Sequence, residues 1–156
     1  MDLFEESYIS FFNLLNKHSV RFILVGGFAV NHHGFNRSTS DLDLWLDESK
    51  TNRENLVNAL KEKKIEGCEA FLTYPLIAGF AEILLDNGVY LDLMSDLQSF
   101  KQKDFDECYK ISQKHKLAEN IEINVLHLNH LIKEKENSKR PKDNLDAETL
   151  KKLYRL

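Results

Sequence analysis

Two aspartates interrupt an apolar run in the segment SDLDLWLD, where Asp41 and Asp43 alternate with leucines. Alternate residues of a strand point to the same face, so the two Cα atoms would lie about 6.6 Å apart along it. Two unpaired carboxylates at that separation repel each other, and a shared divalent cation would neutralise both. The spacing therefore indicates a metal-binding strand. The plainer alternative is that both acids lie on a solvent-exposed sheet face.

A third aspartate occupies the equivalent place in a second alternating run, VYLDLM. Asp92 points away from the apolar residues on either side of it, and it would join the first two acids if the strands pair. Three carboxylates suit two Mg²⁺ ions, which can orient a triphosphate and activate an attacking oxygen. We therefore expect Asp41, Asp43 and Asp92 to form one metal site.

A pair of glycines, Gly26 and Gly27, ends the apolar run RFILV ahead of the first two acids. Where a strand turns into a helix, free backbone N–H groups can hold a phosphate. The pair belongs neither to a Walker loop, which needs a following Gly-Lys-Ser/Thr, nor to a G-x-G-x-x-G dinucleotide fingerprint. We therefore predict that the backbone N–H groups of this glycine turn contact a phosphate beside the predicted metal ligands.

Four histidines suggest a competing zinc site. His32 and His33 are adjacent in sequence and would point apart on a helix, which makes them a poor chelating pair. His127 and His130 are three residues apart and would share a helix face, but they lack a third ligand at a recognisable spacing. The histidine pattern therefore favours zinc less than the aspartate pattern favours magnesium.

The composition is typical of a globular domain of 156 residues with a net charge of −4. This length predicts a single domain over residues 1–156. No apolar run approaches the roughly 20 residues of a membrane span, and the acidic N-terminal segment lacks the basic start of a signal peptide. Two widely separated cysteines, Cys68 and Cys108, predict reduced thiols in a cytoplasmic protein.

Charge is divided unevenly along the chain. Residues 1–100 carry 8 Lys or Arg and 15 Asp or Glu, whereas residues 127–156 carry 8 basic and 5 acidic residues. The acidic body argues against binding a long stretch of nucleic acid, while the basic tail could help to hold a phosphate-rich ligand or an RNA end. A solvated helix face is the alternative for the tail.

Hydrophobic periodicity predicts one α+β domain. The expected helices span residues 2–19, 28–34, 49–64, 98–115, 126–139 and 143–156, and the expected strands span residues 21–27, 40–47, 80–85, 89–94 and 121–126. Asp86-Asn87-Gly88 predicts a hairpin, because the two central positions of a type I′ turn need positive φ. Pro141 would separate the last two helices.

Polar residues mark the expected helix starts. Asp2 and Glu5 resemble a capping pair for the first helix. Ser49 or Thr51 would open the third. Asp143 is at least as good a candidate for the N-cap of the last helix as for a site residue.

The order of strand, Gly-Gly, short helix and strand-borne D-x-D resembles the DNA polymerase β-type nucleotidyltransferase superfamily. Its pattern places a later acid on another strand, and VGG, DLDL and YLDLM fill these places. The thirteen-residue spacer between Gly27 and Asp41 lies at the long end of the pattern. The segments GGFAVNHHGFNRSTSDLDLWL and HLIKEKENSKRPKDNLD are similar to small bacterial members, the minimal nucleotidyltransferases related to abortive-infection toxin enzymes.

The resemblance implies the nucleotidyltransferase fold, with a mixed β-sheet flanked by helices and further helices at the C-terminus. Asp41, Asp43 and Asp92 would then bind Mg²⁺, two ions in all. Asp92 could also help to deprotonate an acceptor hydroxyl. The backbone at Gly26 and Gly27 would approach the β- and γ-phosphates of an NTP such as ATP.

The resemblance also implies that basic residues contact the nucleotide. Lys133, Arg140 and Lys142 are candidates for contacts with the triphosphate. Lys133 could instead be a surface charge of its helix. Arg37 and Thr39 would either steer the nucleotide or brace their loop.

The implied reaction is in-line attack by an acceptor on the α-phosphate of an NTP, which transfers NMP and releases pyrophosphate. The acceptor could be an RNA end, a protein hydroxyl or a small molecule, and the preferred base and the oligomeric state stay open. One alternative is a catalytically silent relative that acts as an antitoxin or binding partner. Another is a substrate-binding or structural subunit of a complex. Magnesium-dependent NTP binding separates the enzyme from both.

Overall fold

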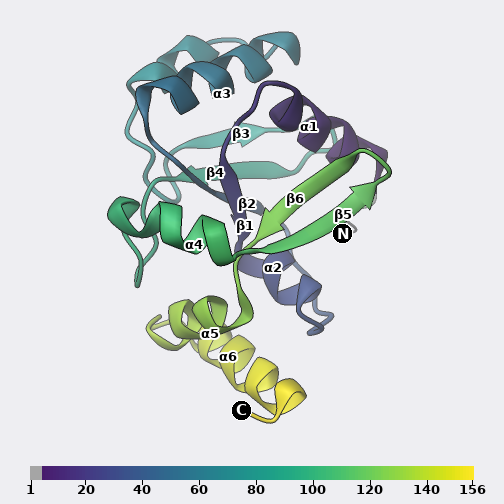
Figure 1. Cartoon of the computed structure of the whole chain (residues 1–156), viewed down its shortest axis with the longest axis vertical. Coiled ribbons are helices and arrows are strands. Elements are labelled where there is room, and N and C mark those ends of the chain that lie inside the picture. Colours follow the sequence, from purple (N-terminus) through teal and green to yellow (C-terminus); the bar gives the residue numbers. More distant parts are fainter. Residues whose placement is uncertain (1–4) are drawn as a thin grey trace.

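A computed structural model describes residues 5–156, whose six helices and six strands form an α+β fold around one mixed sheet (Figure 1). Two short 3₁₀ helices, η1 and η2, complete the elements. In chain order these are α1 (Glu6–Lys17), β1 (Phe22–Val25), α2 (Gly26–His32), β2 (Leu42–Leu46), α3 (Lys50–Glu62), η1 (Cys68–Leu72), β3 (Glu82–Leu84), β4 (Tyr90–Met94), η2 (Gln102–Asp104), α4 (Phe105–Ile111), β5 (Gln113–Ala118), β6 (Ile121–Val125), α5 (Leu128–Glu136) and α6 (Pro141–Tyr154).

The strands are ordered β3-β4-β2-β1-β6-β5 across the sheet. The β2–β4 and β1–β6 pairs are parallel, and the other three pairs are antiparallel. Helices α5 and α6 pack against each other at the end of the molecule opposite α3 (Figure 1). The predicted α+β class and the C-terminal helices are thereby confirmed.

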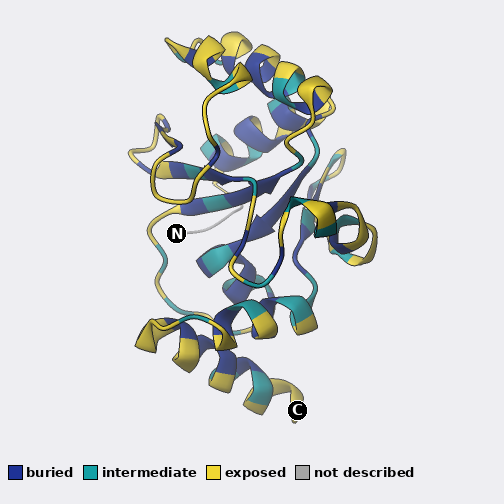
Figure 2. Cartoon of the chain, turned by 90° about the vertical axis from the view of Figure 1, so that its left-hand side faces the viewer, coloured by how far each residue is buried: buried dark blue, intermediate teal, exposed yellow. Residues whose placement is uncertain are grey.

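The core lies along the central strands, where the ribbon in Figure 2 is buried, while the outer turns of the helices at both ends are exposed. Helix α1 buries the stripe that its periodicity predicts, namely Tyr8, Phe11, Phe12 and Leu15. All four residues of β1 are buried, as expected of a central strand that is covered on both faces. The sheet can therefore hold side chains firmly at the ends of β1, β2 and β4.

The helix predicted over residues 98–115 is wrong over much of its length. Only Phe105–Ile111 forms α4, and Gln113–Ala118 is the edge strand β5, paired with β6. Polar residues such as Lys114 and Lys116 break the apolar alternation that indicates a strand. The strand tolerates them because little of this edge strand packs against the core. Pro141 does not separate two helices but begins α6, where its missing N–H is not needed.

The predicted hairpin is confirmed, although its turn is not of type I′. Strands β3 and β4 are antiparallel, and the Gly88 N–H donates to the Leu85 carbonyl at 2.9 Å. Gly88 has a φ of +80°, while Asn87 keeps a negative φ. The turn is therefore a three-residue loop that ends in a left-handed glycine. The Asn87 side-chain oxygen accepts from the Val89 N–H at 3.2 Å and holds the loop.

Other local predictions have mixed outcomes. The Ser49 hydroxyl accepts from the Asn52 N–H at 3.2 Å and caps α3, so Ser49 and not Thr51 opens that helix. Asp2 lies outside the described residues, and Glu5 stands at the N-cap of α1 without a side-chain capping bond. Both cysteines are free and buried. None of the helices described in residues 5–156 is long and apolar enough to cross a membrane.

Candidate functional site

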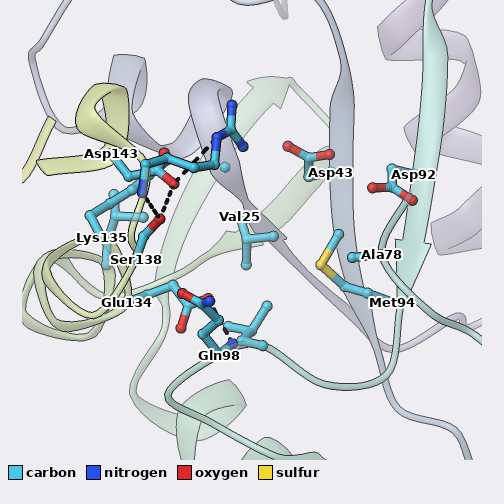
Figure 3. Close-up of a pocket in the computed structure, with 14 residues that line it drawn as sticks. Val25, Asp43, Ala78, Asp92, Met94, Gln98, Glu134, Lys135, Ser138 and Asp143 are labelled. Atoms are coloured by element: carbon cyan, nitrogen blue, oxygen red, sulfur yellow. Dashed lines mark hydrogen bonds and ion pairs between the residues drawn. The ribbon is translucent and has the colours of Figure 1, made fainter. Parts of the chain in front are cut away.

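Asp43 and Asp92 lie side by side on two adjacent strands (Figure 3). The parallel pairing of β2 with β4 places Asp43 opposite Asp92, so both side chains leave the same face of the sheet. Neighbouring strands are about 4.8 Å apart, which brings the carboxylates closer than their distance in sequence could indicate. Asp41 sits one residue before β2 and is exposed. The structure thus pairs two of the three predicted acids and leaves the third beside them on a loop.

The sheet face that carries the two acids is not an open surface around them. Trp45, two residues after Asp43, is fully buried, and its indole N–H donates to the Ser95 carbonyl at 2.8 Å. Phe105 packs edge-on against the Trp45 ring, with centroids 5.1 Å apart. The alternative of a merely solvent-exposed sheet face therefore does not hold for Asp43.

Burial and mutual repulsion disfavour the ionised forms of both acids. Burial first, and then the nearby charges of Asp92 and Asp41, raise the pKa of Asp43 to about 7. Burial also raises the pKa of Asp92, and the hydrogen bond from the Gly79 N–H opposes that shift. Cationic side chains across the site offset part of the effect on Asp43. A bound cation would stabilise both carboxylates.

The acid pair fits a hard divalent cation in donor type but is not a complete protein-only cage. Within residues 5–156 no group of three or more His, Cys, Asp or Glu side chains is gathered closely enough to hold a metal ion. Mg²⁺ commonly uses one or two carboxylates and completes its shell with water and substrate phosphates, so it does not need such a group. Asp43 and Asp92 would hold the ion, with Asp41 beside them.

The histidines do not gather into a zinc site either. His32 packs edge-on against His33 and His115, with ring centroids 4.9 Å and 4.6 Å away. The rings of His127 and His130 are 5.9 Å apart, and the His127 Nδ1 accepts from a backbone N–H at the start of α5. These contacts are those of packing and helix capping.

The two glycines make room for neighbouring side chains. Gly26 has a φ of +69°, and a Cβ there would collide with the Asp43 carboxylate. A Cβ at Gly27 would collide with the Thr39 side chain and come within 3.2 Å of an Arg37 nitrogen. Because these two glycines have no Cβ, the side chains of Asp43 and Thr39 can lie against the backbone. This packing gives both glycines a structural role that is separate from the predicted phosphate contact.

Arg37 makes the contacts of a loop brace. Its Nε and Nη2 each donate to one oxygen of Asp146 at 2.7 Å, and its Nη1 donates to the Ser38 carbonyl at 2.8 Å. Asp146 is fully buried in α6. This bidentate ion pair ties the loop between α2 and β2 to the C-terminal helix, so it sets where Asp41 enters the site.

The structure brings Lys135, and not the predicted Lys133, into the site. Lys133 is exposed, and its Nζ lies over the Phe100 ring at 5.1 Å. Lys135 is buried, and its Nζ contacts Asp143 at 2.9 Å and Asp146 at 3.2 Å. Residues two apart lie on nearly opposite sides of a helix. A sequence signal existed, because Lys135 continues the buried stripe of α5 four residues after an apolar position.

Asp143 is not the N-cap of α6, since Arg140 occupies that position. Its carboxylate accepts from the Ser138 hydroxyl at 2.6 Å and from the Lys135 ammonium at 2.9 Å. Burial opposes ionisation, but these two hydrogen bonds outweigh it and hold the pKa of Asp143 below its usual value. Ser138, Lys135 and Asp146 were absent from the predicted site, and all of them join α5 to α6.

Two adjoining cavities of about 300 Å³ and 210 Å³ share six lining residues and form one groove between the sheet and the C-terminal helices. Figure 3 shows the residues that line the larger cavity. Both cavities are lined by Gly26, Asp43, Asp92, Lys135, Arg140 and Asp143. The smaller one adds the predicted residues Gly27, Arg37, Thr39, Asp41 and Lys142. One wall is thus acidic and the other carries cations, an arrangement that can hold a polyphosphate neutralised by a metal ion.

No family model matches this chain, and no curated protein matches it either.

Proposed function

We propose that this protein is a Mg²⁺-dependent nucleotidyltransferase of the DNA polymerase β-type superfamily, which transfers NMP from an NTP to an acceptor hydroxyl. The observation that carries the proposal is the in-register pair of Asp43 and Asp92, which faces the cationic wall of the groove. Half-buried like charges of this kind are costly unless a cation joins them. The sequence resemblance, which rests on the same aspartates and on the C-terminal segment, supports the same reaction.

The residues of the groove divide into two roles. Asp43 and Asp92, with Asp41 beside them, would hold Mg²⁺, which neutralises triphosphate charge when it is bound. Arg140 is exposed at the start of α6, and Lys142 follows it along the same cavity, so both can reach phosphate oxygens. The groove would thus bind the nucleotide by its phosphates and leave base selection to other contacts.

Asp92 is the candidate general base. Its carboxylate lines both parts of the groove, so it can lie within hydrogen-bond reach of an acceptor hydroxyl that enters there. The acceptor oxygen would bond to the α-phosphorus while the bond to the bridging oxygen breaks, and pyrophosphate would leave with that electron pair. The acceptor proton would pass to a carboxylate oxygen of Asp92. Both carboxylate oxygens of Asp92 accept from the Gly79 N–H at 3.0 Å, and each keeps a further lone pair that can take the proton.

The same Gly79 contact favours a second candidate, a catalytically silent protein that acts as an antitoxin or as a binding partner in a complex. The Gly79 N–H occupies acceptor sites on both oxygens of Asp92 and lowers the basicity of this carboxylate, which makes it a weaker metal ligand and proton acceptor. Such a protein would keep the fold and the groove without magnesium-dependent NTP binding.

Calorimetric titration of each NTP, with Mg²⁺ and with EDTA, tests the enzyme. The variants are Asp43→Asn and the control Asp106→Asn, which changes a carboxylate that is 84% exposed on α4. We expect binding that requires Mg²⁺, is lost in Asp43→Asn and is kept in Asp106→Asn. NTP affinity that is the same in EDTA as in Mg²⁺, or the same in Asp43→Asn as in Asp106→Asn, would refute the metal-dependent site. Pyrophosphate release on addition of acceptor would separate the active enzyme from the silent partner.

A further inference from the structure

An exposed apolar surface lies next to the acid pair. Many of the large apolar side chains that remain exposed lie between residues 72 and 90, with Phe80 the most exposed at 73%. We name this surface the platform, and it consists of Leu72, Tyr74, Ile77, Phe80, Leu84 and Tyr90. Side chains that are exposed singly are normal, whereas exposed apolar side chains that lie beside one another mark an interaction site, and Leu84 and Tyr90 are such neighbours across the hairpin.

The platform continues the sheet face on which the acids stand. Leu84 pairs with Tyr90 across the hairpin, and Glu82 pairs with Asp92. Tyr90 and Asp92 are two residues apart on β4, so they point to the same face. A partner that covers Tyr90 and Leu84 would therefore also border Asp92.

Strand β3 offers a free edge beside these side chains. It is the outermost strand and pairs only with β4 in the part of the sheet that the structure describes. Leu85 and Ala81 bond to the β4 side, through Val89 and Leu93. Alternate residues of an antiparallel strand face alternate neighbours, so Glu82 and Leu84 direct their backbone N–H and C=O groups outward. Such an edge can accept an added strand.

The charge around the platform selects the partner. Residues 65–100 contain no Lys or Arg and six Asp or Glu. Two of the nearby cations of α3 and its end are already engaged, since Lys63 pairs with Asp86 at 2.9 Å and Arg53 donates to the Phe71 and Tyr74 carbonyls. A nucleic acid would be repelled here, whereas basic side chains would be attracted.

We propose that the platform binds an extended segment of a partner protein in which basic and apolar residues take turns at every second position. The segment adds as a strand to β3. On the face of Leu84 and Tyr90, its apolar side chains cover these two and Phe80, and its basic side chains lie beside Glu82, which stands on the same face. Main-chain bonds to Glu82 and Leu84 supply part of the affinity, and the side chains supply the specificity. This proposal does not depend on the proposed reaction.

Fluorescence anisotropy with three labelled probes tests it: the peptide KTLTKTLT, whose lysines and leucines share one face of a strand, its counterpart ETLTETLT, and a single-stranded RNA of about 12 nucleotides. The variants are Phe80→Ser and the control Leu145→Ser, which changes a side chain that is 55% exposed on α6. We expect the full chain to bind only the lysine peptide, more weakly at high salt. Phe80→Ser should weaken that binding about tenfold, and Leu145→Ser should leave it unchanged.

Hydrogen exchange supplies a readout for strand addition itself. The backbone amides of Glu82 and Leu84 should exchange at least about tenfold more slowly when the lysine peptide is bound. Absence of binding, equal binding of the glutamate peptide or the RNA, or equal losses in the two variants would overturn the proposal. Protection that appears elsewhere but not at these two amides would overturn it as well.

Discussion

Asp43→Asn should stabilise the metal-free protein at alkaline pH, which is the reverse of what most substitutions at a buried site do. Burial and the charges of Asp92 and Asp41 raise the pKa of Asp43 from 3.8 to about 7. Ionisation of Asp43 in the folded wild-type protein therefore lowers the free energy of unfolding. Asparagine has nearly the same shape and carries no charge.

The sign follows from proton linkage. Below pH 3.8 Asp43 is neutral in both folded and unfolded chains, and its charge costs nothing. As the pH rises from about 4 to about 7, the unfolded chain releases this proton and the folded chain does not, so wild-type stability falls relative to Asp43→Asn. One pKa unit corresponds to about 1.4 kcal/mol, which sets an upper limit of about 4 kcal/mol for the accumulated difference.

Urea denaturation of both proteins in EDTA, at pH 4 and pH 8, measures this difference, because the other titrating groups are common to both and largely cancel. Each kcal/mol corresponds to about 2–4 °C in Tm for a chain of this size. Adding Mg²⁺ at pH 8 should stabilise wild type and leave Asp43→Asn unchanged. A stability difference between the two proteins that stays constant from pH 4 to pH 8 would refute the assignment of a buried, repelled carboxylate.

Three further substitutions and one control test which residues hold the site together. Gly26→Ala should lower the unfolding free energy by at least about 2 kcal/mol in urea, because positive φ alone costs about 1–2 kcal/mol and the new methyl meets a carboxylate. Arg37→Ala should cost about 2 kcal/mol, since buried Asp146 loses its bidentate partner and keeps only Lys135, and a loss below about 1 kcal/mol would contradict the brace. Lys135→Met should weaken Mg²⁺–NTP binding measured by calorimetry, while Lys133→Met should leave both affinity and stability within about 0.5 kcal/mol.

Much of the local structure follows from the sequence because its signals are short-range. The stripe of α1, the cap at Ser49 and the hairpin before Gly88 each depend on residues a few positions apart. Strand β5 has no such signal, since pairing with β6 makes it a strand despite its polar residues. The position of Lys135 four residues after Leu131 is a short-range signal for its burial, whereas only the packing of α5 with α6 decides that it meets Asp143 and Asp146.

The sequence by itself determined that Asp41 and Asp43 alternate with apolar residues and that Gly26 and Gly27 precede them, because a strand has a period of two. Only the tertiary structure decided that Asp43 lies opposite Asp92, since that register depends on the parallel pairing of two strands distant in sequence. It likewise decided that Arg37 binds Asp146 from another element. Burial of both sheet faces fixes the strand register, and the buried ion pair holds the C-terminal helices over the acids.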